Sequence, residues 1–178
     1  QCSIGASLFA DCNLRYTHWS NVTAHRWVIL NSHLQLSHME NSSLQRCQIA
    51  GDTWVTAATF SASNFTNSGL RSLVGTGVSF QSTKFRQADL GMANFPAGNF
   101  SSVVMTDCLA NESNYSLSNF SDALLTKTTF GGSSFAGADL TKTDFYQSDV
   151  LLADFDNANI ADAKNVLRTK LDRLAHAS

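Results

Sequence analysis

The stretch that decides the fold runs from residue 80 to residue 100 and reads FQSTKFRQADLGMANFPAGNF. Every fifth residue in it is large and apolar, and this spacing extends over all of Phe60–Ile160. In that span, only Gly75 and Ala110 depart from the rule of a large apolar residue at this spacing. An α-helix repeats about every 3.6 residues and a strand every two, so neither accounts for a period of five. The pattern therefore indicates an internal repeat.

The same period extends toward the N-terminus in a shifted phase. Its central positions there are Ile4, Phe9, Leu14, Trp19, Ala24, Ile29, Leu34, Met39, Leu44, Ile49 and Trp54. The step from Trp54 to Phe60 is six residues instead of five, which predicts a one-residue insertion near residues 55–59. The two blocks make 32 five-residue units, and all twelve phenylalanines lie at central positions.

A second signal lies two residues before each central position. In the later block, every residue at this place is Ala, Ser, Thr, Gly or Cys, except Leu73, Val78 and Val103. Residues two apart on an extended segment point to the same side, so each unit sends one large and one small side chain inward. This suits a chain that turns a corner after every unit. Four corners close a square coil of four units, and 32 units predict eight coils joined by hydrogen bonds along the axis.

Stacked coils predict columns of residues that lie one coil, or four units, apart in the sequence. One column is expected to contain Trp54 followed by Gly75, the largest residue beside the smallest. We interpret this as two residues that share space in a close-packed core, with a cavity at Gly75 as the alternative.

These units resemble a known family. The segments FRQADLGMANF (residues 85–95) and FAGADLTKTDFYQSDVLLADFDNANI (residues 135–160) are similar to the pentapeptide repeat proteins, whose consensus is A-(D/N)-L-x-x. The resemblance covers residues 1–163 and implies an all-β fold, a right-handed quadrilateral β-helix. The family motif is structural and carries over no catalytic residue. We therefore expect no enzymatic activity from this chain, unless a longer protein supplies a catalytic domain elsewhere.

Residues 164–178 break the period. Val166, Leu167, Leu171 and Leu174 have helical spacing, which predicts a short C-terminal α-helix. We expect this helix to cap the last coil, because an open β-helix end exposes core side chains and strand edges. A homodimer through this helix or through an end coil is the alternative. The chain begins at Gln1, which we interpret as the start of a processed or excised piece of a longer protein.

Composition gives no global signal for a nucleic-acid or membrane partner. Charged residues are 15% of the 178 residues, the formal net charge is −2, and there is no 18-residue apolar run. Direct DNA binding is therefore not expected. The cysteines lie at small inward positions that are too far apart for disulfides, and free buried thiols favour a reducing compartment. They are Cys2, Cys12, Cys47 and Cys108.

The early coils hold most of the histidines and aromatic–basic pairs. His18 and His38 lie one coil apart in the sequence and should stack on one wall, but no aligned carboxylate or cysteine completes a metal site, so we expect no metal and no cofactor. Trp27 stands where small residues are the rule, so it is either displaced to the surface beside Arg26 or buried in an irregular coil. The candidate protein-binding residues are Trp19, Arg26, Trp27, His38 and Arg46.

Charge is uneven along the chain. Residues 1–86 hold six basic and three acidic groups, whereas residues 87–162 hold two basic and ten acidic groups. Four acidic residues precede central positions on successive walls and should ring one coil: Asp139, Asp144, Asp149 and Asp154. They form the alternative acidic surface, which the resemblance to gyrase-protecting, quinolone-resistance members of the family connects with mimicry of DNA charge.

Three hypotheses follow. The first is a non-catalytic protein–protein interaction scaffold, the repeat domain of a larger bacterial protein or of a secreted effector, in the bacterial cytoplasm or the host cytosol. The second is a DNA-mimicking protein that binds a topoisomerase through the acidic later coils. The third is a purely structural rod. Fold alone does not choose among them.

Overall fold

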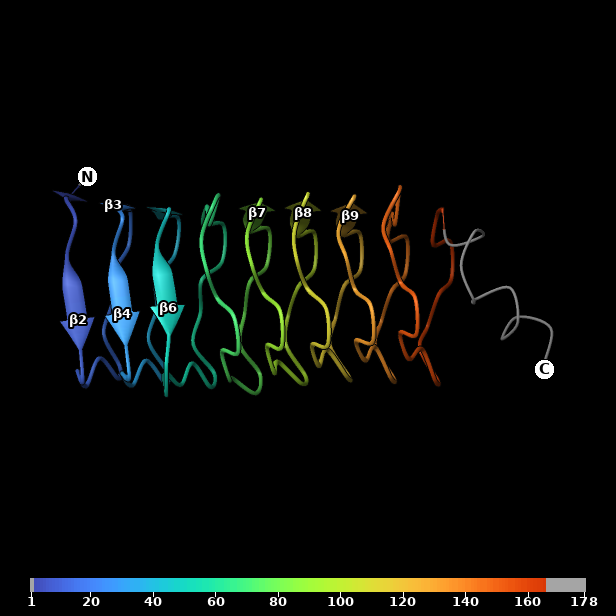
Figure 1. The fold of residues 1–178 in the computed structure, drawn as a ribbon, viewed down its shortest axis with the longest axis horizontal. Helices are drawn as coiled ribbons and strands as arrows, with labels where there is room; N and C mark the ends of the chain where they lie inside the picture. The colour runs from blue at the N-terminus through green and yellow to red at the C-terminus, as the bar shows by residue number, and fades with distance from the viewer. Residues whose placement is uncertain (1, 166–178) are drawn as a thin grey trace.

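The computed structural model describes residues 2–165, which form a single stack of β-coils (Figure 1). Nine short strands and many isolated parallel bridges make up its secondary structure, and residues 2–165 contain no helix. The strands are β1 (Cys2–Ile4), β2 (Leu8–Ala10), β3 (Val22–His25), β4 (Val28–Leu30), β5 (Ser43–Gln45), β6 (Gln48–Ala50), β7 (Lys84–Arg86), β8 (Val104–Thr106) and β9 (Leu124–Thr126).

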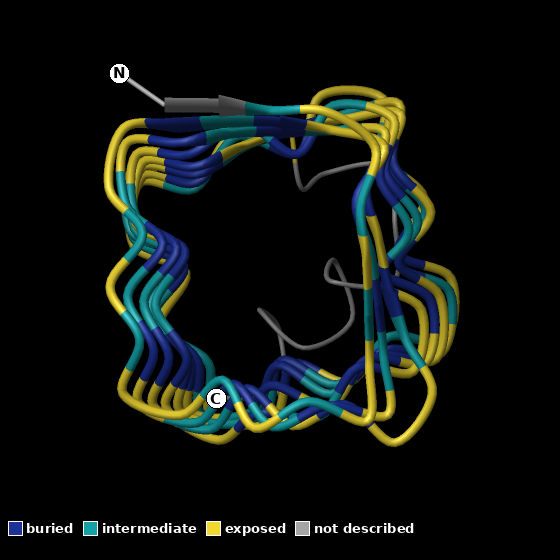
Figure 2. Cartoon of the chain, turned by 90° about the vertical axis from the view of Figure 1, so that its left-hand side faces the viewer, coloured by how far each residue is buried: buried dark blue, intermediate teal, exposed yellow. Residues whose placement is uncertain are grey.

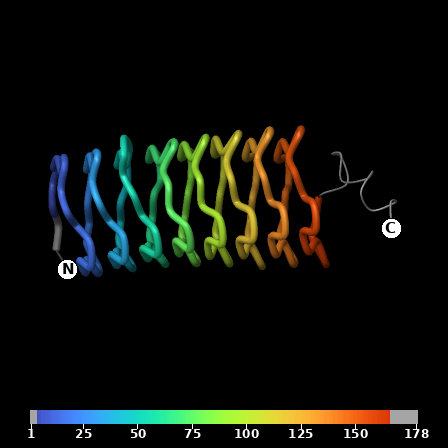
Figure 3. The backbone as a smooth tube through the Cα atoms, turned by 90° about the horizontal axis from the view of Figure 1, so that it is seen from below, coloured from blue at the N-terminus to red at the C-terminus, as the bar shows by residue number. Residues whose placement is uncertain are grey.

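The coils are square in cross-section, with buried segments facing the axis and exposed segments at the corners (Figure 2). Successive coils pair in parallel, and their stacking in one row from the N-terminus is visible from below (Figure 3). One wall can be followed through eight successive pairings, which confirms the expected eight coils. It runs through Ser3, Thr23, Ser43, Asn64, Lys84, Val104, Leu124, Asp144 and Lys164.

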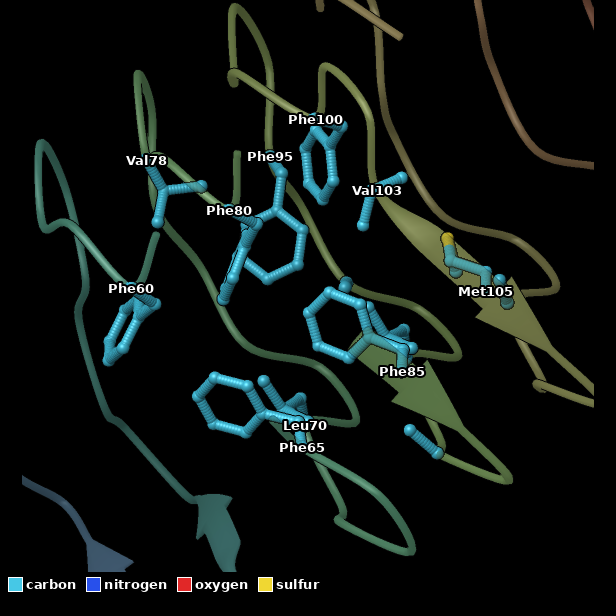
Figure 4. Packing of buried hydrophobic residues seen from close by; sticks show 14 of the residues in the cluster. Phe60, Phe65, Leu70, Val78, Phe80, Phe85, Phe95, Phe100, Val103 and Met105 are labelled. Carbon is cyan, nitrogen blue, oxygen red and sulfur yellow. The ribbon is translucent and has the colours of Figure 1, made fainter. Parts of the chain in front are cut away.

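The core lies along the axis and consists of the central residues together with the inward residues two positions before them. Phe85 and Phe120 are fully buried and Phe145 is 3% exposed, so the five-residue register is confirmed. Rings from successive coils stack, with centroids 5.1 Å apart for Phe60 and Phe80, and rings from adjacent walls meet edge to face (Figure 4). This close packing of large apolar side chains supplies the main stabilisation of the stack.

Two local hydrogen bonds explain the residue preferences of each unit. The residue before the central one accepts the amide N–H two residues later, as Asp89 Oδ1 does from Gly91 N at 2.9 Å, and this fastens the corner. Corner residues then take positive φ angles. Small inward hydroxyls donate to a carbonyl of the preceding coil, as Thr83 Oγ1 does to the Phe60 carbonyl at 2.8 Å. Most buried serine and threonine hydroxyls are satisfied in this way, and Ser37 Oγ is a buried exception without a partner among the described residues.

The phase slip lies earlier than residues 55–59, which corrects the sequence prediction. Gly51 still occupies a corner of the first phase with φ 68°, and Ala57 is the next corner. The extra residue is therefore Asp52. Trp54 consequently precedes a central position and points outward, while Val55 is the buried central residue. Hydrophobicity alone did not show which of the adjacent residues Trp54 and Val55 is the central one, because both are apolar.

Gly75 accordingly stacks on Val55 and not on Trp54. A Cβ added at Gly75 would lie 2.5 Å from Val55 Cγ2 and 3.0 Å from the Val55 carbonyl carbon. Val55 thus occupies the space beside Gly75, and the prediction that Gly75 shares this space with Trp54 was wrong.

At the C-terminal end, the bridge between Asp144 and Lys164 extends the coil beyond residue 163. Asn165 takes the next central position of the register but has a positive φ of 58°, unlike the central residues before it. The remainder of the predicted capping helix, residues 166–178, lies outside the described residues. None of the described segments is a helix of the length and apolar character needed to span a membrane.

Candidate functional site

The stack presents four walls, which we name after one element or residue of each. The β3 wall carries β1, β3, β5, β7, β8 and β9, and the β4 wall carries β2, β4 and β6. The Trp54 wall follows the bridges from Asn13 through His33 and Trp54 to Val74, and the His38 wall follows those from His18 through His38 to Thr59. Each wall includes the corner that follows it in the chain.

Trp27 is buried, which corrects its assignment to a binding surface. Its side chain is 1% exposed, and its Nε1 donates a hydrogen bond to the Gly5 carbonyl at 3.1 Å. The indole packs edge-on against Phe9 and Trp19, with ring centroids 5.1 and 5.4 Å away. The small Ala24 at a central position leaves room for this indole inside the early coils.

The five predicted binding residues do not form one surface. Trp19 points inward with Trp27 and packs against the core. Arg26 and Arg46 are exposed at the corner of the β3 wall, with φ angles of 62° and 55°. His38 lies on another wall, where its ring stacks on His18 at a centroid distance of 4.7 Å, as their one-coil spacing predicted. The prediction grouped these residues by sequence distance, which ignores the walls.

Instead, the structure brings together an exposed patch on the Trp54 wall that the sequence analysis did not find. Trp54 is 45% exposed, and Tyr16 and Leu36 are 68% and 43% exposed at the corner of the same wall. Arg15 Nε donates to Gln35 Oε1 at 3.0 Å, and an Arg15 guanidinium nitrogen lies 3.4 Å from His33 Nδ1. We call Arg15, Tyr16, His33, Leu36 and Trp54 the aromatic patch. The one-coil spacing of Tyr16 and Leu36 was a usable signal, but Trp54 was hidden by the misplaced insertion.

The acidic ring is present around one coil, one carboxylate on each wall. Each carboxylate accepts a corner amide N–H two residues later, at 3.0 Å for Asp139 and Asp144, 2.9 Å for Asp149 and 3.0 Å for Asp154. These aspartates therefore have a structural role in addition to their charge.

Cys12, Cys47 and Cys108 are free, and the two buried ones, Cys47 and Cys108, have no feature of a reactive thiol. Burial raises the pKa of Cys47, and it raises the pKa of Cys108 to about 11. The Cys108 thiol donates to the Phe85 carbonyl at 3.1 Å. A thiol that stays protonated is a poor nucleophile and a poor metal ligand. Within residues 2–165, no group of three or more His, Cys, Asp or Glu side chains is arranged to hold a metal ion.

Comparison with solved structures finds pentapeptide repeat proteins of low sequence identity. HetL, involved in heterocyst differentiation regulation in the cyanobacterium Nostoc sp. strain PCC 7120, is 12% identical over 90% of this chain and 87% of its own, with a TM-score of 0.46. Trypsin-treated QnrB1, a plasmid-mediated fluoroquinolone resistance protein, is 14% identical over 97% and 99%, with a TM-score of 0.41. Rfr23 from the cyanobacterium Cyanothece 51142 is 12% identical over 68% and 90%, with a TM-score of 0.44.

No curated protein sequence matches the chain. The family model described as the pentapeptide repeat region matches residues 78–155. Parallel pairing of coils continues on both sides of the matched segment, from Ser3 to Lys164, with the one-residue insertion at Asp52 inside a corner. Over residues 78–155 the chain is therefore similar to the pentapeptide repeat family.

Proposed function

We propose that this chain is a rigid, non-catalytic protein-interaction module that binds its partner through the aromatic patch. The observation that carries the proposal is the joint exposure of Trp54, Tyr16 and Leu36 on one wall. Tryptophan, tyrosine and arginine are enriched among the hot-spot residues that dominate the binding energy of protein interfaces. Arg15, at the centre of the patch's polar contacts, favours a partner that places a carboxylate beside apolar side chains.

The backbone beneath the patch is fixed by the neighbouring coils. Tyr16 N donates to the Gln35 carbonyl at 3.3 Å, and Leu36 N donates to the Thr56 carbonyl at 3.1 Å. A surface that is ordered before association loses little conformational entropy on binding. The β-coil therefore supports recognition by presenting side chains at set positions.

Affinity capture with quantitative mass spectrometry tests the proposal, followed by reconstitution with the purified partner. Trp54→Ala and Leu36→Ala are each expected to weaken binding by about tenfold or more, as loss of a hot-spot side chain does. Leu117→Ala is the matched control, because Leu117 occupies the same corner of the same wall four coils later and is 69% exposed. Equal binding by all three variants overturns the assignment. Capture of no specific partner by the unmodified chain favours the structural rod.

The acidic later coils support a second candidate, a topoisomerase-binding mimic of DNA charge. Residues 87–162 carry ten acidic and two basic groups. Binding would then depend on the charges of Asp139, Asp144, Asp149 and Asp154 and not on the corner hydrogen bonds that they accept.

Replacement of all four by asparagine separates these two roles. Asparagine keeps an Oδ1 acceptor for the corner amide, and Asn99 already accepts the Ser101 N–H in this way at 3.1 Å. The variant is therefore expected to stay folded and to lose topoisomerase binding by surface plasmon resonance. Undiminished binding contradicts charge mimicry.

The free cysteines indicate the redox state of the compartment in which the protein works. Cys47 and Cys108 are free and buried, which supports a reducing compartment such as the bacterial cytoplasm, or the host cytosol reached by a secreted effector. This placement is tested by rapid alkylation of the thiols in intact cells, followed by recovery of the chain. Both cysteines are expected to be recovered in the reduced form.

A further inference from the structure

The basic residues gather on one wall, although the sequence shows them only as an excess near the N-terminus. Residues 2–165 contain nine lysines and arginines, and six of them lie on the β3 wall and its corner. That wall holds two acidic residues, Asp107 and Asp144, which gives it a net charge of +4 (six minus two). The other walls together hold three basic and eleven acidic residues, or −8. The six are Arg26, Arg46, Lys84, Arg86, Lys127 and Lys164.

The centre of this wall is a pair of cations on one strand. Lys84 and Arg86 lie on β7 on either side of the fully buried Phe85, so both point away from the core. Both are exposed, and neither belongs to the two salt bridges of the described residues, which join His38 to Glu40 and Arg71 to Asp89. Their charges are thus unpaired within residues 2–165.

A surface hollow of about 400 Å³ surrounds the pair. Thr66 lines it on the preceding coil, and Val104 and Thr106 line it on the following coil, opposite Lys84 and Arg86. The hollow therefore offers two cations and the Thr106 hydroxyl to an anionic group, whereas the Thr66 hydroxyl already donates to Asn64 Oδ1 at 2.7 Å. Val104 adds an aliphatic wall for the group's neighbour. Leu124, which pairs with Val104, is 47% exposed and extends the aliphatic part.

We propose that the β3 wall binds an extended acidic segment of a partner protein, with carboxylates at Lys84 and Arg86 and aliphatic side chains on Val104 and Leu124. The basic residues from Arg26 to Lys164 span seven coil spacings, or roughly 34 Å at about 4.8 Å per coil. An extended peptide rises about 3.3 Å per residue, so about ten residues cover this length. The inference concerns a second surface and stands without the aromatic patch.

The chemistry of the wall favours a peptide over a single-stranded nucleic acid. Surfaces that bind single strands place aromatic rings between basic groups so that bases stack. Between Arg46 and Lys127 no aromatic side chain of this wall is exposed, and among its polar and charged side chains lie threonine, valine and leucine. Those side chains match the aliphatic residues of a mixed acidic segment.

Fluorescence anisotropy on the whole chain tests the inference with a labelled peptide of about twelve residues, containing Glu, Leu and Ser. The double variant Lys84→Glu with Arg86→Glu is expected to weaken binding at least tenfold. The matched control, Arg71→Glu with Lys142→Glu, makes the same charge change on other walls and is expected to stay within about twofold. The four substituted side chains are exposed on the surface. Far-UV circular dichroism verifies that each variant is folded.

Two further probes decide the class of partner. The same peptide with Gln in place of Glu is expected to bind at least tenfold more weakly than the acidic peptide. A single-stranded oligonucleotide of equal charge is expected to bind more weakly than the acidic peptide as well. Tighter binding of the oligonucleotide, equal binding of the Gln peptide, or equal losses in the two double variants each overturns the proposal.

Discussion

Replacing Tyr115 by phenylalanine is expected to stabilise the protein. Tyr115 is fully buried at a central position, and its ring stacks on Phe135 with centroids 5.4 Å apart and planes 22° apart. Phe95 and Phe155 occupy the same column, so a phenylalanine ring suits the site. The Tyr115 hydroxyl is buried and has no hydrogen-bond partner among the described residues.

The magnitude follows from that unpaired hydroxyl. Burial of a polar group without a partner costs about 1–3 kcal/mol, because its hydrogen bonds to water in the unfolded chain are lost. Tyr115→Phe removes this cost and leaves the ring, and hence the packing, in place. We expect the free energy of unfolding to rise by about 1–2 kcal/mol, within the range for one unpaired buried polar group.

Urea unfolding followed by circular dichroism measures the change, with Tyr16→Phe as the control. The Tyr16 side chain is 68% exposed, so its hydroxyl is hydrated in both states and its removal is expected to change stability by less than about 0.5 kcal/mol. A loss of stability of about 1 kcal/mol or more in Tyr115→Phe would refute the reasoning, because it would mean that the hydroxyl is hydrogen-bonded in the folded protein.

The remaining predictions concern pH, packing and the corners. Because burial raises the pKa of Cys108 from 9.0 to about 11, the folded chain keeps a proton that the unfolded chain loses, and stability should fall by about 2 kcal/mol as the pH rises from 9 to 11. Cys108→Ala should remove that part of the decline in urea titrations at several pH values, and an unchanged slope contradicts it. Gly75→Ala should cost about 1–3 kcal/mol of unfolding free energy, because the added methyl group meets Val55 backbone and side chain; a neutral effect on the melting temperature would show that the coils can separate. Asp144→Ala should cost about 1 kcal/mol in the same assay and Asp144→Asn much less, and equal costs would argue against the corner bond to Tyr146 N.

The fold was predictable because each five-residue unit repeats the same pattern of one large and one small inward residue. The large residue and the small residue two before it fix which side chains face the axis, and Phe85 and Phe120 are buried as that rule requires. The position of the inserted residue was not predictable in the same way. Trp54 and Val55 are both apolar, so a six-residue step fits either as the central residue, and only the pairing of His33 with Trp54 decides between them.

The candidate site was less predictable than the fold because it depends on which wall a residue occupies. Arg26 and Lys127 lie far apart in the sequence, yet both are corner residues of the β3 wall. Summing charge over sequence halves hides that relationship. The placement of Trp27 on a binding surface was wrong for another reason. The rule of small inward residues does not hold in the early coils, where the small Ala24 leaves the space that the indole fills.

The single inserted residue, Asp52, has a consequence for how such a chain can change length. It enlarges one corner, so the paired positions across it, such as His33 and Trp54, are separated by one residue more than the pairs of the later coils. Every column on every wall continues through the insertion. Corner positions can therefore absorb single-residue insertions one at a time, whereas an extra residue between a small inward position and its central residue would reverse which side chains face the core. Length variation among related chains should accordingly concentrate at corners, and alignments that assume a fixed coil period will misplace every surface residue beyond such a corner.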